Sequence, residues 1–241
     1  MLVLAQEGLK INWVEMPTYN TIMSVAAGVG LLLVVALGRQ LVDGREIAPE
    51  GWSMAFAVLG ALLTATGLHM TLTWPLASGG FAFDNIIFGE PALAFGVLLL
   101  AGALVLWRRA PLFAAAADGA GDRRLEFVRK LATPISLFVF ALGLCCFAIA
   151  AAGWAFTLFA APPEEPISGQ FADYPLIEAT FISGLYVLVG VGAVLFPLAL
   201  HRMRRPLLIV TGGAWTLAGL AFMLFGALNY FTHIGLIVHT Q

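Results

Sequence analysis

The chain has 241 residues, of which 61% are hydrophobic and 11% are charged, and its mean hydropathy is +0.94. This balance lies far outside that of soluble globular domains and indicates an integral membrane protein. Twelve Lys and Arg residues against fourteen Asp and Glu residues give a net charge of −2, which leaves no basic domain for a nucleic acid to bind. We therefore exclude DNA and RNA as partners and expect the chain to contact the lipid bilayer.

Six predominantly apolar runs are long enough to cross a bilayer as helices, because a hydrocarbon core of about 30 Å requires about 20 apolar residues. Their apolar residues cover every face instead of alternating, which excludes the strands of a membrane barrel. Thr133 followed by Pro134 predicts a helix start, and Pro91, Pro175 and Pro206 also lie at or near first turns. The sequence therefore predicts an all-α, polytopic membrane protein with six transmembrane helices, at 17–38, 52–74, 88–107, 133–159, 175–200 and 206–231.

The basic residues give the expected orientation. Eleven of the twelve Lys and Arg residues fall in the loops after the first, third and fifth predicted helices. The positive-inside rule makes that side cytoplasmic, so both termini are expected to be extracytoplasmic. Eleven bases and six acids give the cytoplasmic side a net charge of +5, whereas one base and eight acids give the other side −7. We expect a multi-pass protein of a bacterial or archaeal cytoplasmic membrane.

The stretch 110–122 divides the chain. Its alanine run and its Asp118-Gly-Ala-Gly-Asp122 segment predict a flexible connector. We expect one membrane domain over 1–241, whose parts are a first half at 17–109 with three helices, a cytoplasmic connector at 110–132, and a second half at 133–233 with three helices.

A weak internal similarity relates the two halves. Gly67-Leu-His-Met-Thr71 is followed by a loop and Glu90, and Gly153-Trp-Ala-Phe-Thr157 is followed by a loop and Glu178. Both hairpins run in the same direction, so the sequence predicts a parallel repeat of helices two and three and helices four and five. Chance is the alternative, because Gly, Ala and Phe recur in any helix-rich membrane protein.

Polar side chains gather at one level of the predicted bundle. Ionisable groups inside a membrane are costly and therefore mark candidate functional sites. Five of the six predicted helices carry polar residues near their extracytoplasmic ends, namely Tyr19, Asn20, His69, Glu90, Glu178, Asn229 and His233. The last two, spaced i and i+4, share one face at the predicted end of the sixth helix. This convergence is the main functional signal in the sequence.

Two imidazoles and two carboxylates form a ligand set for a transition metal, so we expect a metal site made by His69, Glu90, Glu178 and His233. His69 and His233, on separate helices, alternatively suit the axial positions of a b-type haem. The remaining polar residues would support either cofactor: Asn20, Asn229 and Tyr19.

Simpler interpretations of these residues stay open. Glu90 and Glu178 each lie where a carboxylate favours the positive end of a helix dipole. His69 is also suited to a hydrogen bond with a carbonyl in the core, and His233 to the membrane interface. No complete catalytic motif is present, so an enzymatic activity is left open.

Three functions are compatible with this pattern. The first is a metal- or haem-carrying subunit associated with electron transport. The second is a structural accessory subunit of a larger membrane complex, or a homo-oligomer. The third is a transporter of a small cation or proton, against which stands the lack of a charged residue near the bilayer centre. The convergence of polar residues favours the first function over the second.

Two segments resemble a known family. Thr66-Gly-Leu-His-Met-Thr-Leu-Thr-Trp-Pro-Leu76 and Asn85-Ile-Ile-Phe-Gly-Glu-Pro91, with Phe95 and Gly96 beyond them, resemble an uncharacterised bacterial and archaeal membrane family catalogued as domain of unknown function 981. The resemblance is closest over 52–107. It implies that the Thr-Trp-Pro and Asn-Ile-Ile-Phe-Gly-Glu-Pro stretches shape the outer loop around Glu90. It brings no assigned activity and no functional residues.

The expected orientation can be tested by labelling in intact cells. Cysteines introduced into the 110–122 loop should be protected from a membrane-impermeant thiol reagent, because the positive-inside rule places this loop in the cytoplasm. Cysteines that replace Ser78 or Ser168 should be labelled. The reverse pattern would invert the orientation and place the polar residues at the cytoplasmic face.

Overall fold

The computed structural model describes residues 19–73, 83–115 and 119–240. These residues form helices and no strand, which confirms the all-α class. Six segments are long and apolar enough to cross a membrane, as predicted. They are α1 (Asn20–Val42), α2 (Pro49–Leu72), α3 (Glu90–Arg108) with the π-helical turn η1 (Asn85–Gly89) that leads into it, α5 (Ala120–Ala155), α6 (Pro175–Arg202) and α7 (Arg205–Thr240). Two short helices, α4 (Ala110–Ala114) and the 3-10 turn η2 (Ser168–Phe171), complete the described elements.

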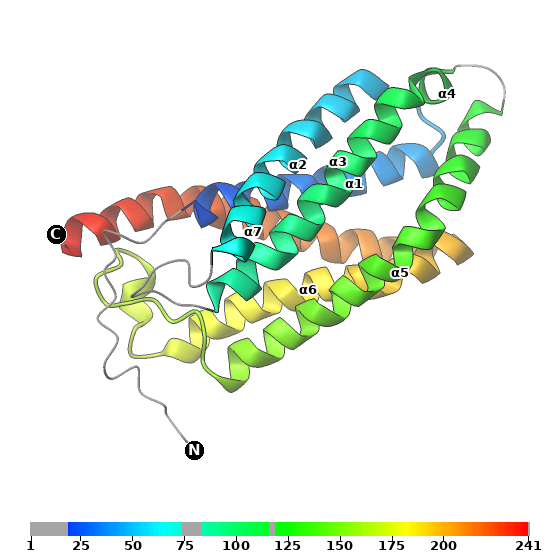
Figure 1. Cartoon of the computed structure of the whole chain (residues 1–241). Coiled ribbons are helices and arrows are strands. Elements are labelled where there is room, and N and C mark those ends of the chain that lie inside the picture. The colour runs from blue at the N-terminus through cyan, green and yellow to red at the C-terminus, as the bar shows by residue number, and fades with distance from the viewer. Residues whose placement is uncertain (1–18, 74–82, 116–118, 241) are drawn as a thin grey trace.

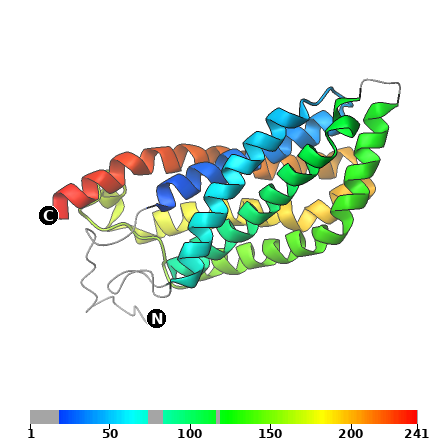
Figure 2. The same ribbon diagram turned by 45° about the horizontal axis from the view of Figure 1, so that its top comes forward.

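The long helices associate in pairs (Figure 1). α2 packs along α3, α5 packs along α6, and α1 packs along α7 although these two are far apart in the sequence. The α1–α7 pair contacts α2 on one side and α6 on the other, and it thereby joins the α2–α3 hairpin to the α5–α6 hairpin (Figure 2). Direct contact between α3 and α5 is sparse.

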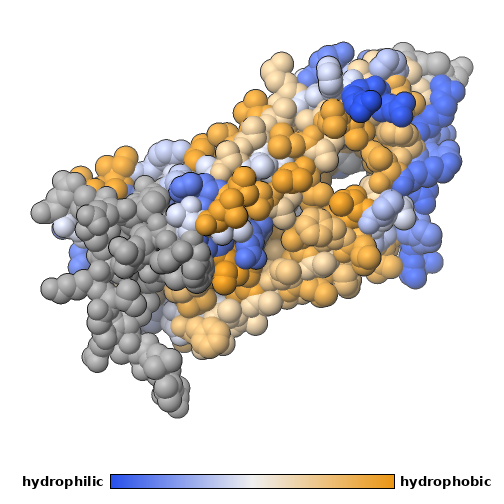
Figure 3. Space-filling view, viewed as in Figure 1, coloured by the Kyte–Doolittle hydropathy of each residue, from blue (hydrophilic) through white to orange (hydrophobic). Residues whose placement is uncertain are grey.

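The two ends of the bundle differ in charge. Eleven of the twelve Lys and Arg residues lie in the connections after α1, α3 and α6 or in the adjoining turns of the helices, and we call this end the basic end. A strongly hydrophilic surface marks it in Figure 3, whereas apolar residues dominate the surface along the spans. The opposite end, where Glu90 and Glu178 begin α3 and α6, is called the acidic end. Which end faces the cytoplasm, and of which membrane, stays a prediction.

Some predicted helix boundaries agree with the structure, and others differ from it or lie outside the described residues. Pro91 and Pro175 lie in the first turns of α3 and α6, and Pro206 is the second residue of α7, as predicted. The expected start at Pro17, the expected end at Trp74 and Asp118 of the expected connector lie outside the described residues. The division into halves and the repeat of the two hairpins stay predictions.

The predicted helix start at Thr133 and Pro134 is wrong, because both residues lie inside α5. Proline removes one backbone N–H from the helix, but tertiary hydrogen bonds hold the turns before it. The buried Arg124 donates to the Phe113 carbonyl at 2.9 Å. Arg129 donates from Nε to the Leu200 carbonyl at 3.0 Å. Most of the expected connector 110–132 is therefore helical.

The predicted end of the sixth helix near Phe231 is also wrong, because α7 continues to Thr240. Its last turns pack on the connector between α5 and α6. A Cβ atom at Gly235 would collide with the Pro166 ring, and Nδ1 of His239 lies 3.0 Å from the Glu164 carbonyl oxygen. These contacts stabilise residues that lie beyond the predicted span.

Close backbone contact holds α1 against α7. A Cβ atom at Gly28 would collide with the backbone N of Met223 and lie 2.6 Å from the Gly219 carbonyl oxygen. Small residues allow helices to approach this closely. Within a membrane the hydrophobic effect does not drive helices together, so their association depends on van der Waals packing. Gly38, on the same helix, has no atom within 4 Å of that position.

We expect Gly28→Ala to destabilise the protein and Gly38→Ala to leave it unchanged or slightly more stable. Overpacking a tight contact costs roughly 1–3 kcal/mol, whereas alanine is favoured over glycine in an open helical position by up to about 1 kcal/mol. The measurement is the thermal unfolding midpoint of both variants in the same detergent. Equal midpoints would show that α1 and α7 do not depend on this contact.

The turn η1 ties the start of α3 to the end of α2. The buried Asn85 donates from Nδ2 to the carbonyl oxygens of Met70 and Thr73, the latter at 2.8 Å. Carbonyls in the last turn of a helix lack partners within that helix, so the Asn85 amide satisfies two of them. Asp84, directly before η1, is also buried. Burial raises the pKa of Asp84 from 3.8 to about 7, because the charged carboxylate loses its hydration.

The stability of the fold should therefore fall as the pH rises from about 4 to about 7. Over this range the folded state keeps a proton on Asp84 that the unfolded chain releases, and a pKa raised from 3.8 to about 7 corresponds to at most roughly 4 kcal/mol. Asp84→Asn should remove the part of this loss that Asp84 contributes. The readout is the difference in unfolding midpoint between about pH 5 and about pH 8.

Asp173→Asn is the matched control, because Asp173 is exposed at the acidic end. It should leave the pH dependence unchanged. An Asp84→Asn variant that keeps the wild-type pH dependence would contradict the assignment to Asp84.

Candidate functional site

His69 and Tyr19, two of the predicted site residues, contact each other. The Tyr19 hydroxyl lies 2.8 Å from Nδ1 of His69, and the two rings meet edge to face with centroids 5.7 Å apart. Tyr19 precedes α1, and partial burial raises the pKa of its hydroxyl above the ordinary value. His69 is exposed near the end of α2. The contact therefore joins the acidic ends of α1 and α2.

Glu178 and His233 lie near a third residue that the sequence analysis did not select, Glu165. This residue belongs to the α5–α6 connector, is buried, and lies within electrostatic range of both Glu178 and His233. Oε2 of Glu178 accepts a hydrogen bond of 2.6 Å from the backbone N–H of Ala161. Glu178 thus ties the connector to the first turn of α6, which is a structural contribution.

Glu90 is exposed at the first residue of α3. Among the described residues, no group of three or more His, Cys, Asp or Glu side chains is arranged to hold a metal ion. The predicted metal site of His69, Glu90, Glu178 and His233 therefore gains no support from the geometry. The haem hypothesis gains none either, because neither histidine lines the cavity of the bundle.

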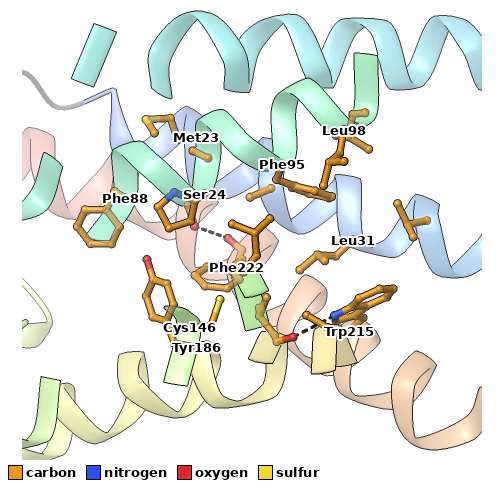
Figure 4. Close-up of a pocket in the computed structure, with 18 of the residues that line it drawn as sticks. Met23, Ser24, Leu31, Phe88, Phe95, Leu98, Cys146, Tyr186, Trp215 and Phe222 are labelled. Atoms are coloured by element: carbon orange, nitrogen blue, oxygen red, sulfur yellow. Dashed lines mark hydrogen bonds between the residues drawn. The ribbon is translucent and has the colours of Figure 1, made fainter. Parts of the chain in front are cut away.

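That cavity has a volume of about 370 Å³. Side chains from α1, α3, α5, α6 and α7 converge on it, as Figure 4 shows for Met23, Phe95, Cys146, Tyr186 and Phe222. No Asp, Glu, Lys, Arg or His is found among the described residues that line it. It is thus an apolar cavity at the depth of the membrane.

The cavity is long and narrow. Its lining on α7 extends from Trp215 to Asn229, which is about 21 Å at 1.5 Å per residue. That length is roughly two thirds of a hydrocarbon core of about 30 Å. A volume of about 370 Å³ along this length suits an extended chain better than a compact ring system.

The cavity opens sideways along α5. Ile135 and Cys145 line it, yet Ile135 is 42% exposed and Cys145 is also exposed. Both lie in the membrane-spanning part of α5, and α5 has little direct contact with α3. The surface is hollowed between these two helices in Figure 3. In a bilayer this opening faces lipid tails.

Tyr186 joins the two sides of the cavity at its acidic half. In an α-helix the Ile87 carbonyl would accept a hydrogen bond from residue 91, but that residue is Pro91, which has no N–H. The Tyr186 hydroxyl of α6 donates to this carbonyl instead, at 2.6 Å. The hydrogen bond fixes α6 relative to η1 in the acidic half of the cavity.

Asn20 and Asn229, two of the predicted supporting residues, line the acidic end of the cavity. They are the predicted site residues that the structure brings to this space. The sequence analysis missed Tyr186, Trp215 and the two cysteines, because aromatic residues and cysteines inside apolar runs look like ordinary packing. A usable signal was the absent N–H of Pro91, which predicts that the carbonyl four residues earlier needs another donor.

The comparisons with known proteins identify a family. The family model described as "Protein of unknown function (DUF981)" matches residues 16–235. The match covers both hairpins and the α1–α7 pair, and it confirms the resemblance seen in the sequence. The comparisons with curated proteins and with solved structures give no match. The chain, with its six candidate membrane spans, therefore belongs to the DUF981 family, for which no function is described.

Proposed function

We propose that this protein binds an apolar molecule that enters its central cavity from the surrounding lipid. The observation that carries the proposal is the uncharged cavity of about 370 Å³ between the two hairpins, open along α5. Ligand pockets have volumes of about 300–1,000 Å³ and are lined mainly by hydrophobic and aromatic side chains. Eight aromatic lining residues fit this description: Phe56, Phe88, Phe95, Tyr186, Phe196, Trp215, Phe222 and Phe225.

Occupancy by an apolar chain is favourable in this space. Residual cavities in protein cores cost roughly 24 cal/mol per Å³, which for about 370 Å³ gives an upper limit of roughly 9 kcal/mol. A hydrocarbon chain regains these dispersion contacts. Water does not, because the cavity offers few polar partners and a bound water needs two to four.

The other functions draw less support from the same geometry. A metal- or haem-carrying electron-transport subunit needs converging ligands, and the described residues show no such group. A small-cation or proton transporter needs ionisable groups along its path, and none lines the cavity. A role as an accessory subunit, or in a homo-oligomer, is compatible with ligand binding, because the cavity leaves the outer faces of α2 and α7 free for partners.

Narrowing the cavity should weaken binding of the apolar molecule. Leu142→Trp enlarges a lining side chain of α5, whereas Leu144→Trp makes the same change two residues later at a position that is 50% exposed and not part of the lining. The assay uses a photoreactive long-chain alcohol in nanodiscs and counts crosslinks to Cys146 and Phe222. We expect Leu142→Trp to reduce these crosslinks at least about tenfold, equivalent to about 1.4 kcal/mol.

The Leu144→Trp variant should show the same crosslinks as the wild type. In both of these proteins, excess unlabelled alcohol should reduce the crosslinks by competing for the cavity. Crosslinks to lipid-facing residues should be similar in both variants, which shows that each is folded and inserted. Wild-type protein whose lining residues acquire no competable crosslinks would refute the proposed function.

A further inference from the structure

We propose that Asn20 and Asn229 form a head-group subsite at the acidic end of the cavity. The ligand class they select is a long-chain amphiphile with an uncharged hydroxyl or carbonyl group at its polar end. This inference rests on the proposed function of the cavity and names the chemistry of its ligand.

The packing of α1 against α7 places the two asparagines at one level. Gly226 of α7 lies against Ser24 and Val25 of α1, and the two helices run antiparallel. One turn before Ser24 on α1 is Asn20, and about one turn after Gly226 on α7 is Asn229. The two amides therefore face the same cavity end from adjacent helices, as their common place in the lining indicates.

Both amides have unused hydrogen-bonding capacity. Oδ1 of Asn20 is buried and has no hydrogen-bond partner. Asn229 is only 8% exposed, and within the described part of the chain its side chain makes no hydrogen bond. A buried polar group without a partner is destabilising. Because each carboxamide carries two donors and an acceptor, a hydroxyl can donate to one asparagine and accept from the other.

The remaining polar lining groups with N–H or O–H donors are already engaged. Ser24 donates to the Phe222 carbonyl at 2.8 Å, and the Trp215 indole donates to the Val189 carbonyl at 3.2 Å. Figure 4 shows both hydrogen bonds at the wall of the cavity. The Tyr186 hydroxyl donates to Ile87.

Asn85 provides an internal comparison with the two lining asparagines. It is buried near the same end and its Oδ1 also lacks a partner, but its Nδ2 donates to two carbonyls at the end of α2. The lining asparagines lack such structural partners, so the free polar capacity of the cavity is concentrated on them.

Charge excludes ionised head groups. No acidic or basic residue is among the described residues that line the cavity, so an anionic or a cationic head group at the subsite would be buried without a counter-charge. The carboxylates of Glu90, Glu165 and Glu178 also make this end of the bundle unfavourable for an anion. A plain hydrocarbon is accepted less well than an alcohol, because it leaves both amides unpaired.

Three photoreactive probes of equal chain length test the inference in nanodiscs: an alkane, a primary alcohol, and a carboxylic acid at a pH where it is ionised. We expect half-saturation of the lining crosslinks at about tenfold lower mole fraction for the alcohol than for the alkane, since one or two hydrogen bonds separate them. The ionised acid should bind more weakly than the alcohol.

The variant Asn229→Leu keeps the side-chain size and removes the amide. It should lower alcohol binding to the level of the alkane and leave alkane binding unchanged, which also shows that the variant is folded. Asn20→Leu should act in the same direction and serves as the second variant. The matched control is Tyr230→Leu, because Tyr230 is the next residue of α7, is 45% exposed and does not line the cavity.

The outcomes separate the two proposals. If none of the three probes labels the lining of the wild type, the proposed function fails. If the wild type binds all three probes equally, or binds the ionised acid best, the cavity binds lipid-like chains but the head-group subsite is refuted. An alcohol preference that survives in both asparagine variants also refutes the subsite.

Discussion

Backbone carbonyls that lose their helical partners must find other donors inside the membrane, and the structure depends on how η1 meets this constraint. The Asn85 amide satisfies the last turn of α2, and the Tyr186 hydroxyl satisfies the Ile87 carbonyl that Pro91 leaves without a donor. The first interaction closes the α2–α3 hairpin and the second attaches it to α6. Since water is absent from the bilayer core, a carbonyl there needs a donor from the protein itself. These hydrogen bonds lie at the acidic end, which fixes this end while direct contact between α3 and α5 stays sparse.

The spans and the helix class follow from composition, because twenty or more apolar residues in a row have few other stable forms in a bilayer. The boundaries depend on tertiary contacts that composition does not contain. Pro134 looks like a helix start, yet α5 begins earlier because Arg124 and Arg129 bind carbonyls of neighbouring segments. Likewise α7 extends past Phe231 because its last turns pack on the α5–α6 connector.

The level of the candidate site was predictable, but its chemistry was not. Asn20 and Asn229 could be selected from the sequence because they are polar residues in apolar runs. An amide in a transmembrane helix is costly, and it therefore marks a candidate functional position. Residue type alone then favoured histidine and glutamate as ligands of a cofactor. In the structure, His69 contacts Tyr19 and Glu178 binds the connector, so these residues have local partners, whereas the asparagines face the cavity. Which polar groups remain free is decided by packing.

The cavity itself follows from the distribution of glycine. Gly67 and Gly96 bring the backbones of α2 and α3 together, and Gly143 and Gly190 do so for α5 and α6. Within the described residues, no glycine of α3 packs against α5 or the reverse. In a membrane, helices approach closely where small residues permit it. Between α3 and α5, bulky side chains such as Phe95 line the cavity. Tight packing within each hairpin therefore leaves a space between the two hairpins, and a lipid-like chain is suited to fill it.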